Sequence, residues 1–145
     1  MQRDIHLKWF FPHTVEEVWA CLTDSELMGE WLMKNNFKPV VGHKFEFRHK
    51  ARGGWNGIAY CEVLELLPNE KLVYSWKGGP SDGVITLDSV LTWTLTKTAN
   101  GTELHLAHTG FKGVKNYFVS FIMEKGWQKI IGRRFTSLLK PSHAA

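Results

Sequence analysis

His108 is the polar residue whose position suggests chemistry most directly. In a predicted strand it shares the parity of Leu104 and Leu106, so its imidazole should face the interior with those apolar side chains. In an apolar cavity, a neutral imidazole can hydrogen-bond a ligand carbonyl or hydroxyl, or it can act as a general base. The position equally suits a core histidine whose hydrogen bonds are satisfied by the protein. Both interpretations remain open on the sequence alone.

Aromatic residues are abundant, with 7 Trp and 9 Phe among 145 residues. A core of this size seldom needs so many large side chains, so either the core is built from unusually large residues or some of them line a pocket. Trp76, Trp93 and Trp127 are predicted to meet between sheet and helix, where they either stack on a flat apolar ligand or simply fill the core. The candidate ligand-binding residues are Phe45, Phe47, Trp76, Trp93, His108, Phe118, Phe121, Trp127 and Ile131.

Other reactive residues carry weaker signals, and we assign no catalytic residue. Cys21 and Cys61 are isolated in the sequence, which predicts structural thiols in a reducing compartment and no disulfide framework. The remaining histidines show no ligand spacing, so neither a metal site nor a cofactor is predicted. The paired glycines at 53–54 and 78–79 precede no helix, unlike those of a phosphate-binding loop.

The charge distribution argues against some classes of partner. The formal net charge is +4, and from Lys112 onward seven basic residues stand against one acidic residue, Glu124. This excess is too modest and too local to favour nucleic acid. No apolar run approaches the roughly 20 residues of a membrane span, and the first residues lack the apolar centre of a signal peptide. We therefore expect a cytoplasmic protein.

The pattern of the first two-thirds predicts a strand, two short helices and then an antiparallel sheet. Residues 5–11 alternate as a strand, and Thr14 with Glu17 forms a capping box that begins a short helix. Asp24 or Ser25 can cap a second short helix. From 43 to 111 the pattern is β throughout, with five strands joined by short connections, including the hairpin signal Asn100-Gly101.

The last third is predicted to be one long helix with two apolar stripes. The first contains Phe118 and Phe121, and the second runs from Trp127 to Leu139. The stripes are offset, so we expect the helix to kink or restart near Gly126, with the Trp127 half sealing the sheet. At the Phe118 half we expect either the mouth of a cavity or a docking site for a second subunit. Lys125, Lys129, Arg133 and Lys140 are predicted to form a solvated face, and Pro141 to end the helix.

Several motifs in this order resemble a known family. They are Thr14-x-x-Glu17-Val18-Trp19, Val41-Gly42-x-x-Phe45-x-Phe47, Pro68-Asn69-Glu70, Thr102-Glu103-Leu104 with His108-Thr109-Gly110-Phe111, and Gly126-Trp127. Together they resemble bacterial homologues of the activator of the ninety-kilodalton heat-shock chaperone's ATPase, within the START-like superfamily. The resemblance implies an α+β helix-grip fold over residues 1–145 as a single domain. In that fold a curved antiparallel sheet surrounds a long C-terminal helix, and two short helices follow the first strand.

The resemblance leaves three functions open, because this fold hosts many functions. The leading hypothesis is a non-catalytic domain that binds a small apolar or aromatic molecule, with His108 as a polar anchor. The second is a co-chaperone-like role in the stress response, in which the acidic helices at 15–33 or the basic C-terminal face bind a heat-shock chaperone. The third is a cyclase- or dehydratase-like enzyme with His108 as general base. Either a monomer or a homodimer is compatible with the sequence.

Overall fold

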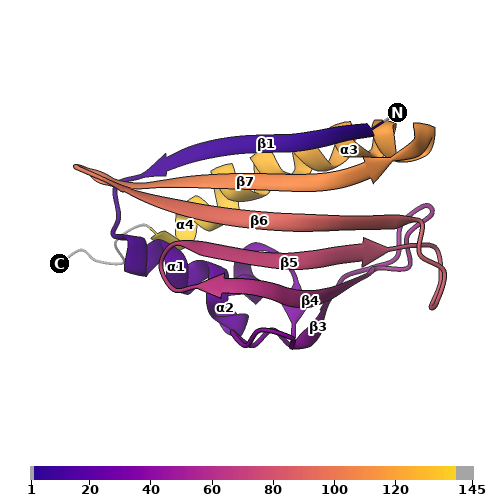
Figure 1. The fold of residues 1–145 in the computed structure, drawn as a ribbon, viewed down its shortest axis with the longest axis horizontal. Coiled ribbons are helices and arrows are strands. Elements are labelled where there is room, and N and C mark those ends of the chain that lie inside the picture. Colours follow the sequence, from indigo (N-terminus) through magenta and orange to yellow (C-terminus); the bar gives the residue numbers. More distant parts are fainter. Residues whose placement is uncertain (1, 140–145) are drawn as a thin grey trace.

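The computed structural model describes residues 2–139, and within them seven strands form one curved antiparallel sheet (Figure 1). The strand order is β1-β7-β6-β5-β4-β3-β2, so the first strand pairs with the last and lies at one edge. The strands are β1 (Gln2–Phe11), β2 (Lys34–Asn35), β3 (Lys44–Arg48), β4 (Ile58–Leu67), β5 (Lys71–Gly78), β6 (Leu87–Thr98) and β7 (Gly101–Lys112). The five strands predicted from 43 to 111 are confirmed; the short β2 was not anticipated.

Two short helices follow the first strand, as predicted. In α1 (Val15–Thr23), the hydroxyl of Thr14 accepts from the backbone N–H of Glu17, and the Glu17 carboxylate accepts from the backbone N–H of Thr14. This confirms the capping box. Asp24 caps α2 (Ser25–Trp31) by accepting from two backbone N–H groups of the first turn.

One face of the sheet is apolar because side chains alternate along each strand. On β6 and β7 the inward positions are fully buried, and the intervening positions on β6 are mostly threonines that are partly exposed. Trp93 lies at the centre of this face, with its indole N–H donating to the Tyr74 hydroxyl at 3.0 Å. The apolar side chains of this face and of the helices form one hydrophobic core.

The long C-terminal helix lies against this face, behind β1 and β7 in the view of Figure 1. It consists of α3 (Gly113–Lys129), a π-helical segment η1 (Ile130–Phe135) and α4 (Thr136–Leu139). The expected kink near Gly126 is wrong, because α3 continues through it and the irregularity begins at Ile130. Lys125, Lys129 and Arg133 are exposed, as predicted. Lys140 and Pro141 lie outside the described residues.

The π-helical segment keeps the second apolar stripe facing the sheet. Trp127, Ile131, Phe135 and Leu139 are buried at intervals of four residues. In an α-helix such intervals overshoot one turn by about 40°, so the stripe would drift around the helix. A π turn holds more residues than an α turn, and this offsets the drift. The stripe predicted to seal the sheet therefore does so.

The first half of α3 is tied to the edge strand β1 through Arg3. Its guanidinium donates to the Ser120 hydroxyl at 3.2 Å and to the Glu124 carboxylate at 2.6 Å. The same guanidinium lies 3.8 Å above the ring of Phe121, within the range of a cation–π interaction. No helix in residues 2–139 has both the length and the apolar character needed to cross a membrane.

Candidate functional site

A pocket of about 430 Å³ lies between α3, the β5–β6 end of the sheet and the loop that precedes β4. Its walls are mainly apolar, and its volume falls within the range of small-molecule sites. The lining residues are Leu32, Met33, Arg52, Gly53, Gly54, Trp55, Trp76, Gly78, Gly79, Thr86, Leu87, Lys115, Asn116, Val119, Ile122, Met123, Gly126, Trp127 and Ile130.

The helix contributes a continuous stripe to the pocket. Val119, Met123, Gly126 and Ile130 recur at three- and four-residue intervals, which places them on one face of α3 and the start of η1. Gly126 lies in the middle of this stripe. A Cβ atom added there meets nothing within 4 Å, so the missing side chain leaves open space in the pocket.

Two loops form the opposite wall and pack closely: the loop between β3 and β4 (49–57) and the loop between β5 and β6 (79–86). Arg52 and Trp55 pair across a tight turn through two backbone hydrogen bonds of 2.9 and 2.7 Å. The Trp55 indole N–H donates to the Ile58 carbonyl at 2.9 Å, which fixes the ring in the wall. At Gly79 a Cβ atom would lie 1.7 Å from the carbonyl oxygen of Val84, so only glycine allows this approach.

The loops are also joined to the start of α3. The Asn116 side-chain amide donates to the Thr86 carbonyl at 2.7 Å, and the backbone N–H of Asn56 donates to the Gly79 carbonyl at 2.9 Å. These bonds connect both loops and the helix around the pocket. The wall is therefore assembled from three segments far apart in the sequence.

A chain of hydrogen bonds lies behind the pocket wall. Trp127 Nε1 donates to His108 Nδ1 at 3.1 Å, and His108 Nε2 lies 2.8 Å from Ser89 Oγ. Ser89 Oγ in turn donates to the Trp76 carbonyl at 2.7 Å. Because Nδ1 accepts from Trp127, the proton of the neutral ring is on Nε2, which donates to Ser89. The chain thus begins at one lining tryptophan and ends at the backbone of another.

His108 is fully buried, and burial lowers its pKa to about 3. Its imidazole is therefore neutral near neutral pH, and both ring nitrogens have protein partners. The inward orientation predicted from strand parity is confirmed. His108 is not among the pocket-lining residues, and it acts on the pocket by holding Trp127. The geometry matches a core histidine with satisfied hydrogen bonds.

The predicted tryptophan cluster is present. Trp127 packs edge-to-face on Trp93, with ring centroids 5.6 Å apart, and against Trp76 at 5.8 Å. Of the three rings, those of Trp76 and Trp127 line the pocket, and Trp93 lies in the core behind them.

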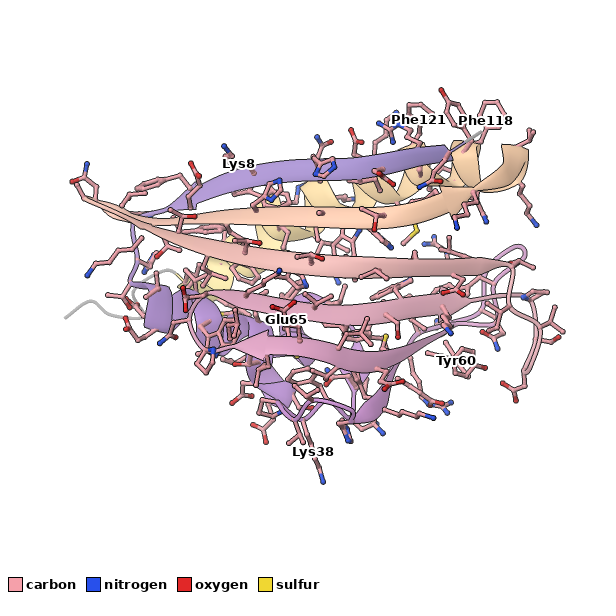
Figure 2. All side chains as sticks on the ribbon, in the orientation of Figure 1. Lys8, Lys38, Tyr60, Glu65, Phe118 and Phe121 are labelled. Carbon is pink, nitrogen blue, oxygen red and sulfur yellow. The ribbon has the colours of Figure 1, made fainter. Side chains whose placement is uncertain are left out.

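The other predicted ligand-binding residues lie outside the pocket lining. Phe45, Phe47 and Ile131 are buried in the core. Phe118 is 62% exposed and Phe121 is 41% exposed. Figure 2 shows Phe118 and Phe121 projecting from the edge of the molecule, away from the sheet. The pocket does adjoin the half of α3 that contains Phe118, but it is lined by a different face of the helix, which includes Val119 and Met123.

Residues 12–140 match the family described as "Activator of Hsp90 ATPase homolog 1-like protein". The chain belongs to this family. Among curated proteins, none matches the chain.

Several solved structures share the fold of this chain. It is similar to protein MLL2253 from Mesorhizobium loti, with a TM-score of 0.86 and 34% identity over 98% of this chain and 100% of that one. Protein BH1534 from Bacillus halodurans has a TM-score of 0.76 and 24% identity, covering 97% and 100%. DynU16, from the dynemicin biosynthetic locus, has a TM-score of 0.76 and 22% identity, covering 97% and 49%. At these identities the last two support the fold alone.

Several lining residues of this family member were missed by the sequence reasoning. Val119 and Met123 belong to the helical stripe that lines the pocket, but their apolar side chains are not distinguished in the sequence from the two stripes that were predicted. Trp55 follows two turn glycines, and nothing in this sequence context indicates a pocket wall. Arg52 and Lys115 are 63 positions apart, and no sequence pattern connects them.

The two cysteines lie outside the pocket lining. Both cysteines are free and buried, and burial raises the pKa of Cys21 to about 11 and the pKa of Cys61 further. In this part of the chain, no three His, Cys, Asp or Glu side chains gather as a metal ion would require.

Proposed function

We propose that this protein binds a small hydrophobic molecule and does not transform it. The observation that carries the proposal is the apolar pocket between α3 and the sheet, walled by Trp55, Trp76 and Trp127. Three indole rings around about 430 Å³ suit a flat or compact apolar ligand. Gly126 supports the same view, because a side chain there would occupy the space.

We propose binding without catalysis because, in the described part of the chain, the pocket lacks the side chains that usually act as general acids, bases or nucleophiles. Within residues 2–139, no Asp, Glu, His or Cys lines the pocket. His108 has no free nitrogen, since Nδ1 accepts from Trp127 and Nε2 donates to Ser89. A cyclase- or dehydratase-like mechanism with His108 as general base would have to break this chain first, so it has less support.

Titration with neutral N-phenylnaphthylamine tests the proposal through the rise in the probe's fluorescence. We expect saturable binding to a single site, accompanied by quenching of tryptophan fluorescence. Gly126→Leu should weaken binding by at least about tenfold, because the leucine side chain occupies the open space that the ligand needs. Gly29→Leu is the matched control, since Gly29 is exposed on α2 with open space around its Cβ position.

The control variant should bind the probe as the unchanged protein does. Circular dichroism and the urea midpoint of both variants show whether each is folded. Lack of saturable binding to the unchanged protein would refute a ligand-binding role, and equal binding by Gly126→Leu would place the ligand elsewhere.

A second candidate function is binding to an Hsp90-type chaperone, the partner named in the family's description. The specific observation is an exposed apolar face on the first half of α3, formed by Val114, Phe118, Phe121 and Ile122. Ile122 is 71% exposed although it also touches the pocket. A helix that is apolar on nearly all sides is normally covered by another surface.

The chaperone's ATPase rate, measured with and without this protein, tests the second candidate. A change in rate that is lost in the Phe118→Ser, Ile122→Ser double variant would support it. Val84→Ser, on the exposed β5–β6 loop, is the control for removing an exposed apolar side chain. An unchanged ATPase rate together with self-association in sedimentation would instead assign the face to a second copy of the chain.

A further inference from the structure

The ionisable groups that line the pocket are both cations. They are Arg52, at the tight turn before β4, and Lys115, in the first turn of α3. No acidic side chain in residues 2–139 lines the pocket. The remaining polar contribution comes chiefly from Thr86 and Asn116, which are already joined by a hydrogen bond.

Lys115 of α3 reaches the turn that contains Arg52, so both cations line the pocket where the helix and this turn come together. Lys115 extends from the helix across to the turn, where its Nζ lies 3.9 Å from the position that a Cβ atom of Gly54 would occupy. Gly54 belongs to the turn that Arg52 and Trp55 close by backbone pairing. We call the place where Lys115 Nζ reaches this turn the meeting point. The absence of side chains at Gly53 and Gly54 leaves the meeting point open.

No carboxylate of the described chain neutralises either cation, since neither forms an ion pair within residues 2–139. Glu124 is the acidic residue of α3, and its carboxylate is bound to Arg3 at 2.6 Å, on the β1 side of the helix. The positive charge at the meeting point is therefore available to an anion. Both side chains are largely exposed, which marks the meeting point as the mouth of the pocket.

We infer that the ligand of this pocket is an amphiphile with an apolar body and a single carboxylate, which Arg52 and Lys115 bind at the mouth. This inference rests on the proposed ligand-binding function and adds the chemical class of the ligand. The body lies against Trp76, Trp127 and Met123, and the head group remains at the mouth, so its charge is not buried. A guanidinium can hold a carboxylate through two parallel hydrogen bonds, and the ammonium adds a third donor.

Naphthylacetic acid and naphthylacetamide are the matched probes, because they share body and shape and differ in charge. Quenching of tryptophan fluorescence gives the affinity of each. We expect the acid to bind about five- to tenfold more tightly at low ionic strength, and this preference should shrink as salt screens the exposed charges. In the Arg52→Gln, Lys115→Gln double variant, the preference for the acid should disappear, so that the two probes bind with equal affinity.

Lys38→Gln, Arg133→Gln is the control, because it removes the same charge from exposed positions outside the pocket lining. Lys38 projects from the edge of the molecule opposite Phe118 and Phe121 (Figure 2). This control should keep the preference for the acid. Equal binding of both probes to the unchanged protein would overturn the inference while leaving the ligand-binding proposal standing. If neither probe nor N-phenylnaphthylamine bound, the ligand-binding proposal itself would fail.

Discussion

The indole nitrogen of Trp127 lies 3.1 Å from Nδ1 of His108 and donates its hydrogen to it. One side of the Trp127 ring contributes to the pocket, and its polar edge is bound to a residue inside the sheet. The orientation of this pocket wall therefore depends on a histidine that does not line the pocket. This relationship makes His108 a positioning residue, and its replacement should affect stability first.

His108→Leu is expected to lower the free energy of unfolding by about 1–3 kcal/mol, because the Trp127 N–H is left buried without an acceptor. Urea unfolding at neutral pH, followed by circular dichroism, measures the change. His105→Leu is the control, since His105 lies half-buried on the outer face of the sheet, stacked on His6. Its cost should stay below about 1 kcal/mol. Equal costs for both variants would mean that the Trp127–His108 bond contributes little.

Stability should also depend on pH through His108. Burial lowers its pKa from the ordinary value of 6.5 to about 3 in the folded protein. Between these values the unfolded chain binds a proton that the folded chain does not, so the free energy of unfolding falls as pH falls. Protonation of His108 alone changes the free energy of unfolding by up to about 1.4 kcal/mol per pH unit in this range. Above the pKa of His108 in the unfolded chain, this residue contributes no pH dependence.

Urea unfolding at a series of pH values, for the unchanged protein and for His108→Gln, isolates this effect from the other titrating groups. The unchanged protein should lose stability more steeply on acidification than the variant. Parallel pH profiles would show that His108 does not titrate differently in the folded and unfolded states.

Replacing a side chain by alanine should affect stability very differently in the two halves of the long helix. Ile131 is fully buried in η1, and Ile131→Ala should lower the free energy of unfolding by about 2–5 kcal/mol. Phe118 is 62% exposed in α3, and Phe118→Ala should change the free energy of unfolding by less than about 0.5 kcal/mol. Thermal or urea unfolding of both variants provides the measurement. A large cost at Phe118 would reveal that a second subunit covers this face.

The buried thiols should be unreactive in the folded protein. Burial raises the pKa of both Cys21 and Cys61, which lowers the fraction of nucleophilic thiolate and also blocks access. A coloured disulfide reagent should label neither cysteine at mildly alkaline pH, and it should label both once urea unfolds the chain. Fast labelling of the folded protein would mean that one thiol becomes exposed in solution.

The fold was largely predictable because it depends on local patterns. The Thr14–Glu17 capping box and the alternation of the β6 residues each specify an element through spacing alone. The parity of His108 with Leu106 was sufficient to place its imidazole inside. The two-residue β2 was too short to leave a periodic signal. The offset of the two helical stripes indicated an irregular turn, but its position depends on backbone hydrogen bonding that residue types do not specify.

The site was less predictable because it depends on tertiary packing. A helix with apolar residues on nearly all sides does not reveal which stripe faces the sheet, so Phe118 and Phe121 were chosen over Val119 and Met123. Lys115 reaches the turn that contains Arg52 only when the segment before β4 folds against α3. Trp76 and Trp127 were found because large residues between sheet and helix serve both the core and the pocket wall.

The π-helical segment η1 has a consequence for how this pocket can change. Removing one residue between Ile130 and Phe135 would convert the wide turn into an ordinary one, and the preceding helix would rotate by about 100° relative to the following stripe. A single-codon deletion could thus present a new set of side chains to the pocket, without altering any residue that lines it. The lining of such a pocket can diverge by a change of helical phase as well as by substitution.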